Sequence, residues 1–387
     1  MNPFKYGKEV AGYQFYDRSE SCGQLYRTLK DGSTNVVLYA PRRYGKTSLV
    51  LKVLHQFKNE GVKCIHFDLS KINSLEKFCV EYTQAVYALW GGLPEIVSKL
   101  KEYLVHLHPT VSFSDGILPE ITFDYGERMN SLAVSEVLDL PEKLAEQMGD
   151  EAVVIAFDEF QDVADLTKSV PLEAVFRSVI QSHKRVRYVF LGSKTHLMQR
   201  MFGSRSRPFY KSALSVKIGK PPEEESVEFL VSRFAAEGIE IADPVLSRML
   251  EISQNIPYFL QAMAALSFQS VEARGGRKVE DSDLDAAIVR FTEGNEDYYD
   301  EILRNLAEAQ LPLLEALAHE PTDRFDETYR KRHRLGGLST VHSAVRGLMR
   351  RGIIDSVKGV YAMDDPFFAR YVCRRKPTTV LTGRDLC

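Results

Sequence analysis

Three sequence features follow one another without spacers between residues 35 and 54. They are a short β-branched run, a Gly-Lys-Thr loop and an apolar pattern with helical spacing. Residues 35–39 predict a buried strand, residues 40–47 a tight loop, and the apolar spacing from Ser48 onward a helix. A loop wrapped over a helix N-terminus points backbone N–H groups and the positive end of the helix dipole at an anion. This succession therefore predicts a phosphate-binding loop in an α/β sheet.

The residue types of this loop match the chemistry of a bound nucleotide. Gly45 lets the backbone approach a phosphate, Lys46 can reach the β- and γ-phosphates, and the Thr47 hydroxyl can ligate Mg²⁺. Ala40 replaces the first glycine of the pattern G-x-x-x-x-G-K-[ST], which a negative φ would allow. The alternative is a chance Gly-Lys-Thr in a turn. The expected contacts are Ala40, Pro41, Arg42, Arg43, Tyr44, Gly45, Lys46, Thr47 and Ser48.

A second motif ends another predicted strand. The continuous apolar run at 152–157 is typical of a strand buried on both faces of a parallel sheet, and Asp158 and Glu159 follow it. Open α/β sheets bind ligands at the carboxyl ends of their strands. Asp158 can hold the Mg²⁺ of a nucleotide, and Glu159 can orient and deprotonate the attacking water. Taken alone, such a pair is often only a solvated strand end.

Polar residues also follow the predicted strand at 185–191. Ser193 can sense a γ-phosphate by hydrogen bonding, Thr195 is the second choice, and a helix N-cap is the alternative for either. Three arginines come next: Arg200, Arg205 and Arg207. An arginine here could stabilise transition-state charge, or the three could form a solvated basic loop.

The chain divides into three predicted domains. Residues 1–219 form the nucleotide-binding core, with residues 109–127 as an irregular or hairpin insertion that turns at Asp115 and Gly116, and Gly-Lys-Pro-Pro at 219–222 marks the boundary. Residues 220–296 read as four amphipathic helices that can close over the nucleotide as a lid. Pro257 is expected at a first helical position there, and it joins the expected nucleotide contacts.

Residues 297–387 predict a winged-helix domain, because a capped helix at 338–351 precedes a hairpin at 352–363. Four residues of that helix are expected on its outer face: His342, Ser343, Arg346 and Arg350. They could meet duplex DNA, although winged helices also dock proteins, so both partners stay open. From residue 321 onward, 14 Lys and Arg stand against 7 Asp and Glu, a net charge of +7, whereas the whole chain carries −3.

Composition narrows the class of protein. A chain of 387 residues has room for two or three domains. Its five cysteines form no C-x-x-C pair, which predicts neither a disulfide framework nor a zinc site and favours a reducing, cytoplasmic location. No apolar run approaches the ~18 residues of a membrane span, so we expect no membrane partner. The oligomeric state stays open.

Five motifs resemble those of the archaeal-type P-loop ATPases, which are AAA+/STAND-related proteins similar in plan to archaeal replication initiators. They are A-P-R-R-Y-G-K-T-S at 40–48, V-V-I-A-F-D-E-F-Q at 153–161, F-L-G-S at 190–193, I-P-Y-F-L-Q at 256–261 and D-D-P-F-F-A-R-Y-V at 364–372. The resemblance implies ATP rather than GTP, with hydrolysis assigned to Lys46, Thr47, Asp158 and Glu159. The family often has an arginine after Pro-Leu-Tyr, where this chain has Lys211, so the resemblance assigns no arginine finger.

These observations predict a P-loop NTPase fold of the ASCE or AAA+-like type, in which a parallel α/β sheet with helices on both faces is followed by a helical lid and a winged helix. The expected function is that of a Mg²⁺-dependent ATPase whose nucleotide state controls the winged helix. Two alternatives are an ATP-dependent DNA-binding initiator or mobile-element helper, and a signalling scaffold that binds ATP and recruits a protein.

Overall fold

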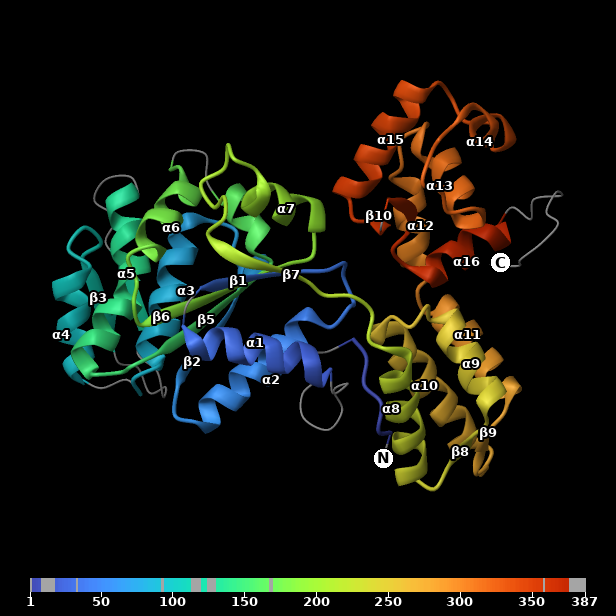
Figure 1. Cartoon of the computed structure of the whole chain (residues 1–387), viewed down its shortest axis with the longest axis horizontal. Coiled ribbons are helices and arrows are strands. Elements are labelled where there is room, and N and C mark those ends of the chain that lie inside the picture. Colours follow the sequence, from blue (N-terminus) through green and yellow to red (C-terminus); the bar gives the residue numbers. More distant parts are fainter. Residues whose placement is uncertain are drawn as a thin grey trace. The chain divides into compact units, whose positions relative to one another are not determined.

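The computed structural model describes residues 2–7, 18–32, 34–91, 94–112, 120–123, 130–166, 170–357 and 359–375. These residues form two compact units (Figure 1). Residues 18–40 and 45–219 make up the first, which we call the sheet unit. Residues 2–7, 41–44 and 220–375 belong to the second, which we call the helical unit. Four residues of the predicted phosphate loop therefore pack with the helical unit.

The sheet unit is built on five parallel strands in the order β2-β5-β6-β1-β7. These strands are β1 (Asn35–Tyr39), β2 (Lys63–Asp68), β5 (Val153–Asp158), β6 (Val186–Gly192) and β7 (Ala213–Lys217). Strand β6 lies between β1, which leads into the phosphate loop, and β5, which ends in Asp158. Tyr39 pairs with Gly192, and Phe157 pairs with Phe190. The carboxyl ends of the three central strands therefore meet at one edge of the sheet.

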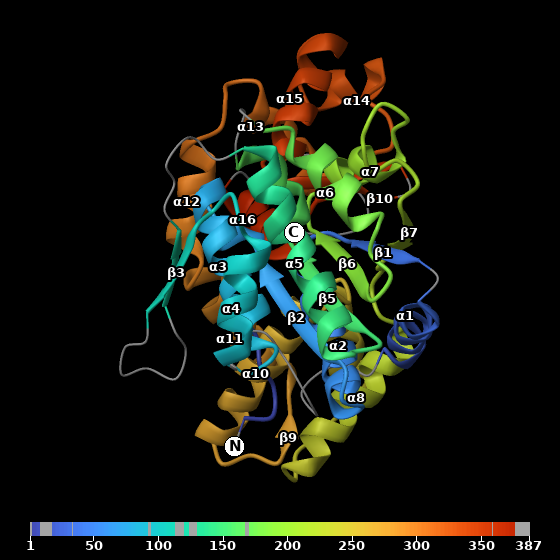
Figure 2. The same cartoon turned by 90° about the vertical axis from the view of Figure 1, so that its left-hand side faces the viewer.

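Helices cover both faces of this sheet, as predicted (Figures 1 and 2). One face carries α1 (Ser19–Asp31) and α2 (Lys46–Asn59). The other carries α3 (Leu75–Ala88), α4 (Pro94–Tyr103), α5 (Ser131–Met148) and α6 (Leu172–Ile180). On this second face Phe157 packs against Tyr82 of α3 and Phe176 of α6, with ring centroids 5.5 and 5.7 Å apart. Burial of these large rings contributes to holding the layer in place.

The predicted insertion forms a small antiparallel hairpin of β3 (Pro109–Ser112) and β4 (Glu120–Phe123). Its expected turn at residues 115 and 116 lies outside the described residues. The last helix of the sheet unit, α7 (Thr195–Gly203), follows β6.

The helical unit begins with four helices, as the sequence predicts. They are α8 (Glu223–Ala236), α9 (Asp243–Ile252), α10 (Pro257–Ala273) and α11 (Asp281–Glu293), joined by the two-residue strands β8 (Glu240–Ile241) and β9 (Lys278–Val279). The N-terminal segment at residues 2–7 packs into this bundle, where Phe4 is buried against Phe234, with ring centroids 4.7 Å apart. Asn2 Nδ2 donates to the carbonyl of Ala265 at 2.9 Å.

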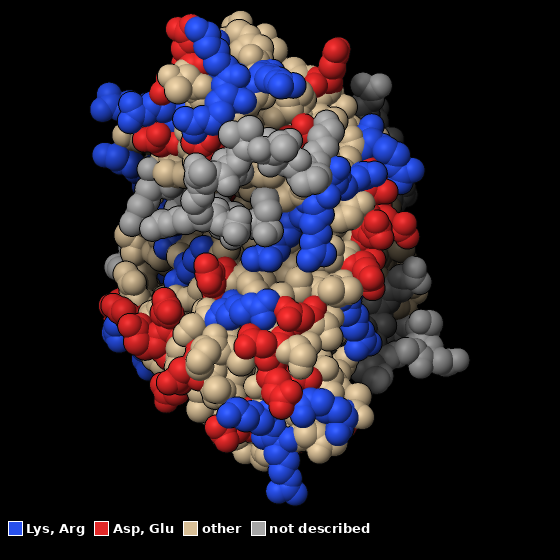
Figure 3. All heavy atoms as spheres, turned by 90° about the vertical axis from the view of Figure 1, so that its right-hand side faces the viewer, with Lys and Arg blue, Asp and Glu red and all other residues tan. Residues whose placement is uncertain are grey.

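The remaining helices and a hairpin form the predicted winged helix. They are α12 (Glu296–Arg304), α13 (Gln310–His319), α14 (Glu327–Arg332), α15 (Leu338–Arg350), β10 (Ile354–Val357), β11 (Val360–Met363) and α16 (Pro366–Arg375). Strands β10 and β11 pair antiparallel, and Thr322 adds a short bridge to Tyr361 of the wing. Lys and Arg side chains gather at the end of this domain, where α14 and α15 lie (Figure 3).

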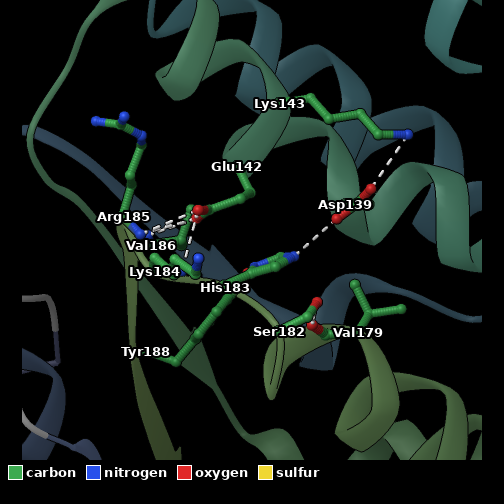
Figure 4. A network of polar contacts seen from close by, with 10 residues as sticks. All are labelled: Asp139, Glu142, Lys143, Val179, Ser182, His183, Lys184, Arg185, Val186 and Tyr188. Atoms are coloured by element: carbon green, nitrogen blue, oxygen red, sulfur yellow. Dashed lines mark hydrogen bonds and ion pairs between the residues drawn. The ribbon is translucent and has the colours of Figure 1, made fainter.

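A polar network anchors the amino end of β6 (Figure 4). Glu142 of α5 accepts hydrogen bonds from the backbone N–H groups of Lys184, Arg185 and Val186 at 2.9–3.1 Å. Beside it, buried His183 lies 2.8 Å from the Tyr188 hydroxyl and 3.1 Å from Asp139 Oδ1. Hydrogen bonds with ionised partners are about twice as strong as neutral ones, so this network attaches α5 firmly to the strand.

Candidate functional site

The phosphate loop has the backbone conformation that its sequence requires. Ala40 is buried and has a negative φ, so the missing first glycine is tolerated. Gly45 has φ 79°, a left-handed conformation that favours glycine, and stands directly before α2. Lys46, only 6% exposed, is the first residue of α2. The loop thus ends at a helix N-terminus, which is the geometry of an anion site.

Thr47 and Asp158 meet at the carboxyl edge of the sheet although they are distant in the sequence. The Thr47 hydroxyl donates to Asp158 Oδ2 at 2.6 Å, and His66 Nε2 of β2 lies 3.2 Å from the same oxygen. Burial by itself would raise the pKa of the Asp158 carboxyl, but the contacts with His66 and Thr47 outweigh burial and lower it. A hydroxyl oxygen and an ionised carboxylate are the ligands that Mg²⁺ prefers, so this pair fits the metal.

Glu159 lies beside this pair, with its carboxylate held by two neighbouring residues. Its own φ is 49°, a left-handed value that is uncommon for a residue other than glycine. Ser193 donates to Glu159 Oε2 from both its hydroxyl, at 2.6 Å, and its backbone N–H, at 3.2 Å. Gln161 Nε2 donates to the same oxygen at 2.6 Å. Among the described residues, all the donors to this carboxylate contact Oε2, and none contacts Oε1.

Gly192 leaves the space that this arrangement needs. A Cβ at position 192 would lie 2.6 Å from Gln161 Oε1 and 2.3 Å from Met198 Cγ. Both distances are shorter than any ordinary contact, so a side chain here would displace Gln161 and disturb the support of Glu159.

Two residues of the site were missed by the sequence analysis, namely His66 and Gln161. In the sheet, β2 pairs with β5 so that His66 stands opposite Ala156, two positions before Asp158. A histidine in an otherwise apolar strand was the available signal, but only the register brings it to Asp158. Gln161 lies in a short 3₁₀ helix, Phe160–Asp165, and although it is the last residue of the motif at 153–161, the motif assigned it no role.

The structure shows where the candidate residues that follow β6 lie. Ser193 contacts Glu159, whereas Thr195 begins α7. Arg207 forms an ion pair with Glu173 of α6, and Arg200 and Arg205 are exposed. A role in catalysis for any of the three arginines stays a prediction.

A second group of predicted residues lies in the helical unit. Pro257 is the first residue of α10, and the next N–H, that of Tyr258, donates to the carbonyl of Arg43 at 3.4 Å. The Arg43 guanidinium lies over the rings of Tyr258 and Phe259, 4.8 Å from each centroid, and forms an ion pair with Asp365. Burial opposes its charge, yet Asp365 keeps the pKa of Arg43 above its ordinary value.

The outer face of α15 is exposed as predicted. His342, Ser343, Arg346 and Arg350 all point to solvent, while Val341, Ala344, Val345 and Leu348 are buried. Among the described residues, Arg346 and Arg350 have no acidic partner, whereas nearby Arg332 is paired with Glu320 at 2.8 Å. Unneutralised cations on a winged helix provide charge that a polyanion could use.

Comparison with curated protein sequences gives no match. A family model described as a probable winged helix domain matches residues 297–374. Within the described residues, no helix combines the length and apolar content that a membrane span requires.

Similarity to solved structures extends over almost the whole chain. A Walker-type ATPase of Pyrococcus abyssi is similar over 96% of this chain and 99% of its own, with 18% identity and a TM-score of 0.66. The ORC2 protein of Aeropyrum pernix, in ADPNP–ADP complexes, is similar over 93% and 95%, with 12% identity and a TM-score of 0.55. The ORC1 protein of the same organism, in complex with DNA, is similar over 96% and 94%, with 14% identity and a TM-score of 0.51.

The fold is that of the P-loop ATPases, a parallel sheet with helices on both faces, and it is followed by a C-terminal winged helix. Its structural neighbours are the archaeal Walker-type ATPases and ORC proteins, as the motifs of the phosphate loop and of β5 suggest. A closer relation to STAND proteins stays a prediction.

Proposed function

We propose that this protein is a Mg²⁺-dependent ATPase whose nucleotide state controls the winged helix. The observation that carries the proposal is the 2.6 Å contact between Thr47 of the phosphate loop helix and Asp158 at the end of β5. It joins the expected phosphate site to the expected metal ligand. The similarity to a Walker-type ATPase and to an ORC2 protein solved in ADPNP–ADP complexes supports it.

In this proposal each residue of the site has a distinct role. Lys46 and the N–H groups of residues 42–48 bind the phosphates, and Thr47 and Asp158 would hold Mg²⁺. The metal, when bound, supplies positive charge that neutralises the phosphates. Glu159 orients the attacking water and accepts its proton, while Ser193 and Gln161 fix the carboxylate in position.

Two substitutions test this division of roles. Lys46→Ala should abolish ATP binding, measured by titration with a fluorescent ATP analogue in the presence of Mg²⁺. Glu159→Gln should retain binding and lower phosphate release by about 100-fold or more, because it removes only the proton acceptor. The ATPase proposal fails if the wild-type protein does not bind ATP, or if both variants release phosphate at the wild-type rate.

A DNA-binding function is the second candidate, and the exposed arginines of α15 favour it. The ORC1 neighbour was solved in complex with DNA, and Arg346 and Arg350 offer charge that no described acidic residue neutralises. Binding to duplex DNA should weaken with rising salt, and Arg346→Ala with Arg350→Ala should lower its salt dependence. Arg277→Ala, which lies between α10 and β9, is the matched control. Identical elution of all variants from a DNA column would exclude this candidate.

Glu159→Gln distinguishes the signalling scaffold from the other two candidates, the ATPase and the DNA-binding protein. A scaffold that only binds ATP keeps its partner and its biological activity when hydrolysis stops. Loss of that activity in Glu159→Gln would exclude a scaffold that works without hydrolysis.

A further inference from the structure

One motif of the chain has no role in the proposed chemistry, the Asp-Asp-Pro-Phe-Phe run at residues 364–368. Its second aspartate, Asp365, forms the ion pair with Arg43. These residues are 322 positions apart in the sequence. Their side chains are only 13% and 27% exposed, so water screens the pair less than it would a surface pair. A residue of the winged-helix domain therefore holds a residue of the phosphate loop.

The carboxylate of Asp365 is itself fixed. Its Oδ1 accepts hydrogen bonds from the N–H groups of Phe367 and Phe368, at 2.9 and 3.0 Å, and so caps the start of α16. Its Oδ2 contacts Arg43 and accepts from the Tyr299 hydroxyl of α12 at 3.3 Å. Each carboxylate oxygen of Asp365 thus has its own partners. The carboxylate cannot rotate to move one oxygen without breaking the contacts of the other.

Arg43 needs such support because of its backbone. Its φ is 71°, a left-handed conformation that side-chain-bearing residues disfavour. Left-handed residues within a short loop turn successive N–H groups toward one point and create an anion-binding concavity. Arg43 stands two residues before Gly45, which is also left-handed. The conformation of Arg43 therefore helps to decide where the loop N–H groups point.

We propose that Asp365 is a positioning residue for the phosphate loop and acts through the Arg43 guanidinium. The start of α16 then helps to hold residues 41–44 of the phosphate loop, which belong to the same unit. A partner that displaces the start of α16 would loosen the loop, and by linkage a bound nucleotide would resist that displacement. The predicted effect on nucleotide affinity rests on the proposed function, whereas the predicted effect on the loop does not.

The first test uses the nucleotide-free full-length protein and needs no ATP. Hydrogen exchange of the amides at residues 42–46 should accelerate about tenfold in Asp365→Asn, because a charge-assisted contact that holds Arg43 is lost. Asparagine keeps an oxygen for the cap of α16. Arg43→Gln removes the same pair from the loop side and should accelerate the same amides. Asp323→Asn, an exposed aspartate of the winged helix, is the matched control and should change nothing.

A double substitution separates positioning from general weakening. If Asp365 acts through Arg43, the two changes together should accelerate the loop amides no more than either alone. Additive acceleration, or acceleration that extends equally to the amides of α5, would overturn the proposal. Unchanged loop exchange in both single variants would also overturn it.

The second test measures affinity for the fluorescent ATP analogue with Mg²⁺. Asp365→Asn should weaken binding about tenfold, and the double variant should match the single variants. If the wild-type protein binds no analogue while the loop amides respond as expected, the proposed ATPase function fails and the positioning role stands. If the wild-type protein binds the analogue and Asp365→Asn alters neither exchange nor affinity, the positioning role fails and the function stands.

Discussion

Polar networks lie at both ends of β6, but their hydrogen-bond partners differ in kind. At the amino end, Glu142 accepts from three backbone N–H groups, which no ligand could replace without unfolding the strand. At the carboxyl end, Asp158 and Glu159 accept hydrogen bonds from the side chains of Thr47, Gln161 and Ser193 as well as from two backbone N–H groups. Backbone partners make a network structural, whereas side-chain partners leave it able to exchange. We call the amino end the fixed end and the carboxyl end, where the proposed ATPase site lies, the reactive end.

The largest effect should come from the reactive end. Asp158→Asn should lower phosphate release by about 100-fold or more, because it removes the only ionised ligand proposed for Mg²⁺. Its free energy of unfolding should change by less than about 1 kcal/mol, since asparagine keeps an oxygen for Thr47. Phosphate release and urea unfolding measure the two effects. A collapse of stability in this variant would show that the reactive end is structural as well.

At the fixed end, a substitution should lower the free energy of unfolding rather than phosphate release. Glu142→Ala should lower the free energy of unfolding by about 2 kcal/mol, because three backbone N–H groups at the start of β6 lose their acceptor. Glu146→Ala, exposed on the same helix one turn later, is the control and should change stability by less than about 0.5 kcal/mol. Urea unfolding distinguishes the two. Equal stability of both variants would remove the contrast between the ends.

A smaller effect is expected from His66, which supports the reactive end without contacting the expected phosphates. His66→Ala should raise the Mg²⁺ concentration needed for half-maximal phosphate release by about tenfold, because Asp158 loses a group that orients it. The maximal rate at saturating Mg²⁺ should change less. A lower rate with an unchanged Mg²⁺ requirement would argue against an orienting role.

The smallest effect concerns pH. The contact with His183 lowers the pKa of Asp139 more than burial raises it, and Lys143 lowers it further. A carboxyl with a depressed pKa in the folded state stabilises the fold above its unfolded pKa of about 4, and this contribution is lost as the pH falls through the folded value. Asp139→Asn should therefore reduce stability at pH 7 but bring it closer to that of the wild type at pH 3. An unchanged difference at both pH values would contradict this.

The sequence predicts the architecture well because its signals are local. Residues 35–54 specify a strand, a loop and a helix within one stretch, and the apolar run before Asp158 marks a central parallel strand. Parallel strands present their carboxyl ends at the same edge of a sheet, and this rule predicts that Lys46, Thr47 and Asp158 lie together there.

Other parts of the site depend on contacts that no local pattern specifies. His66 reaches Asp158 only through the register of β2 against β5. The pair of Arg43 and Asp365 joins residues 322 positions apart, and its motif was identified without a role. Such contacts are consequences of packing between elements, so sequence reasoning could not predict them.

The close packing around Gly192 changes how a substitution at this position should be interpreted. Replacing it with alanine adds one methyl group and removes no charged or reactive atom, so it would ordinarily be judged mild. Here that methyl group would occupy the volume that Gln161 and Met198 fill, and Glu159 would lose one of its donors. A conservative change at a strand end can thus silence the chemistry indirectly, by crowding.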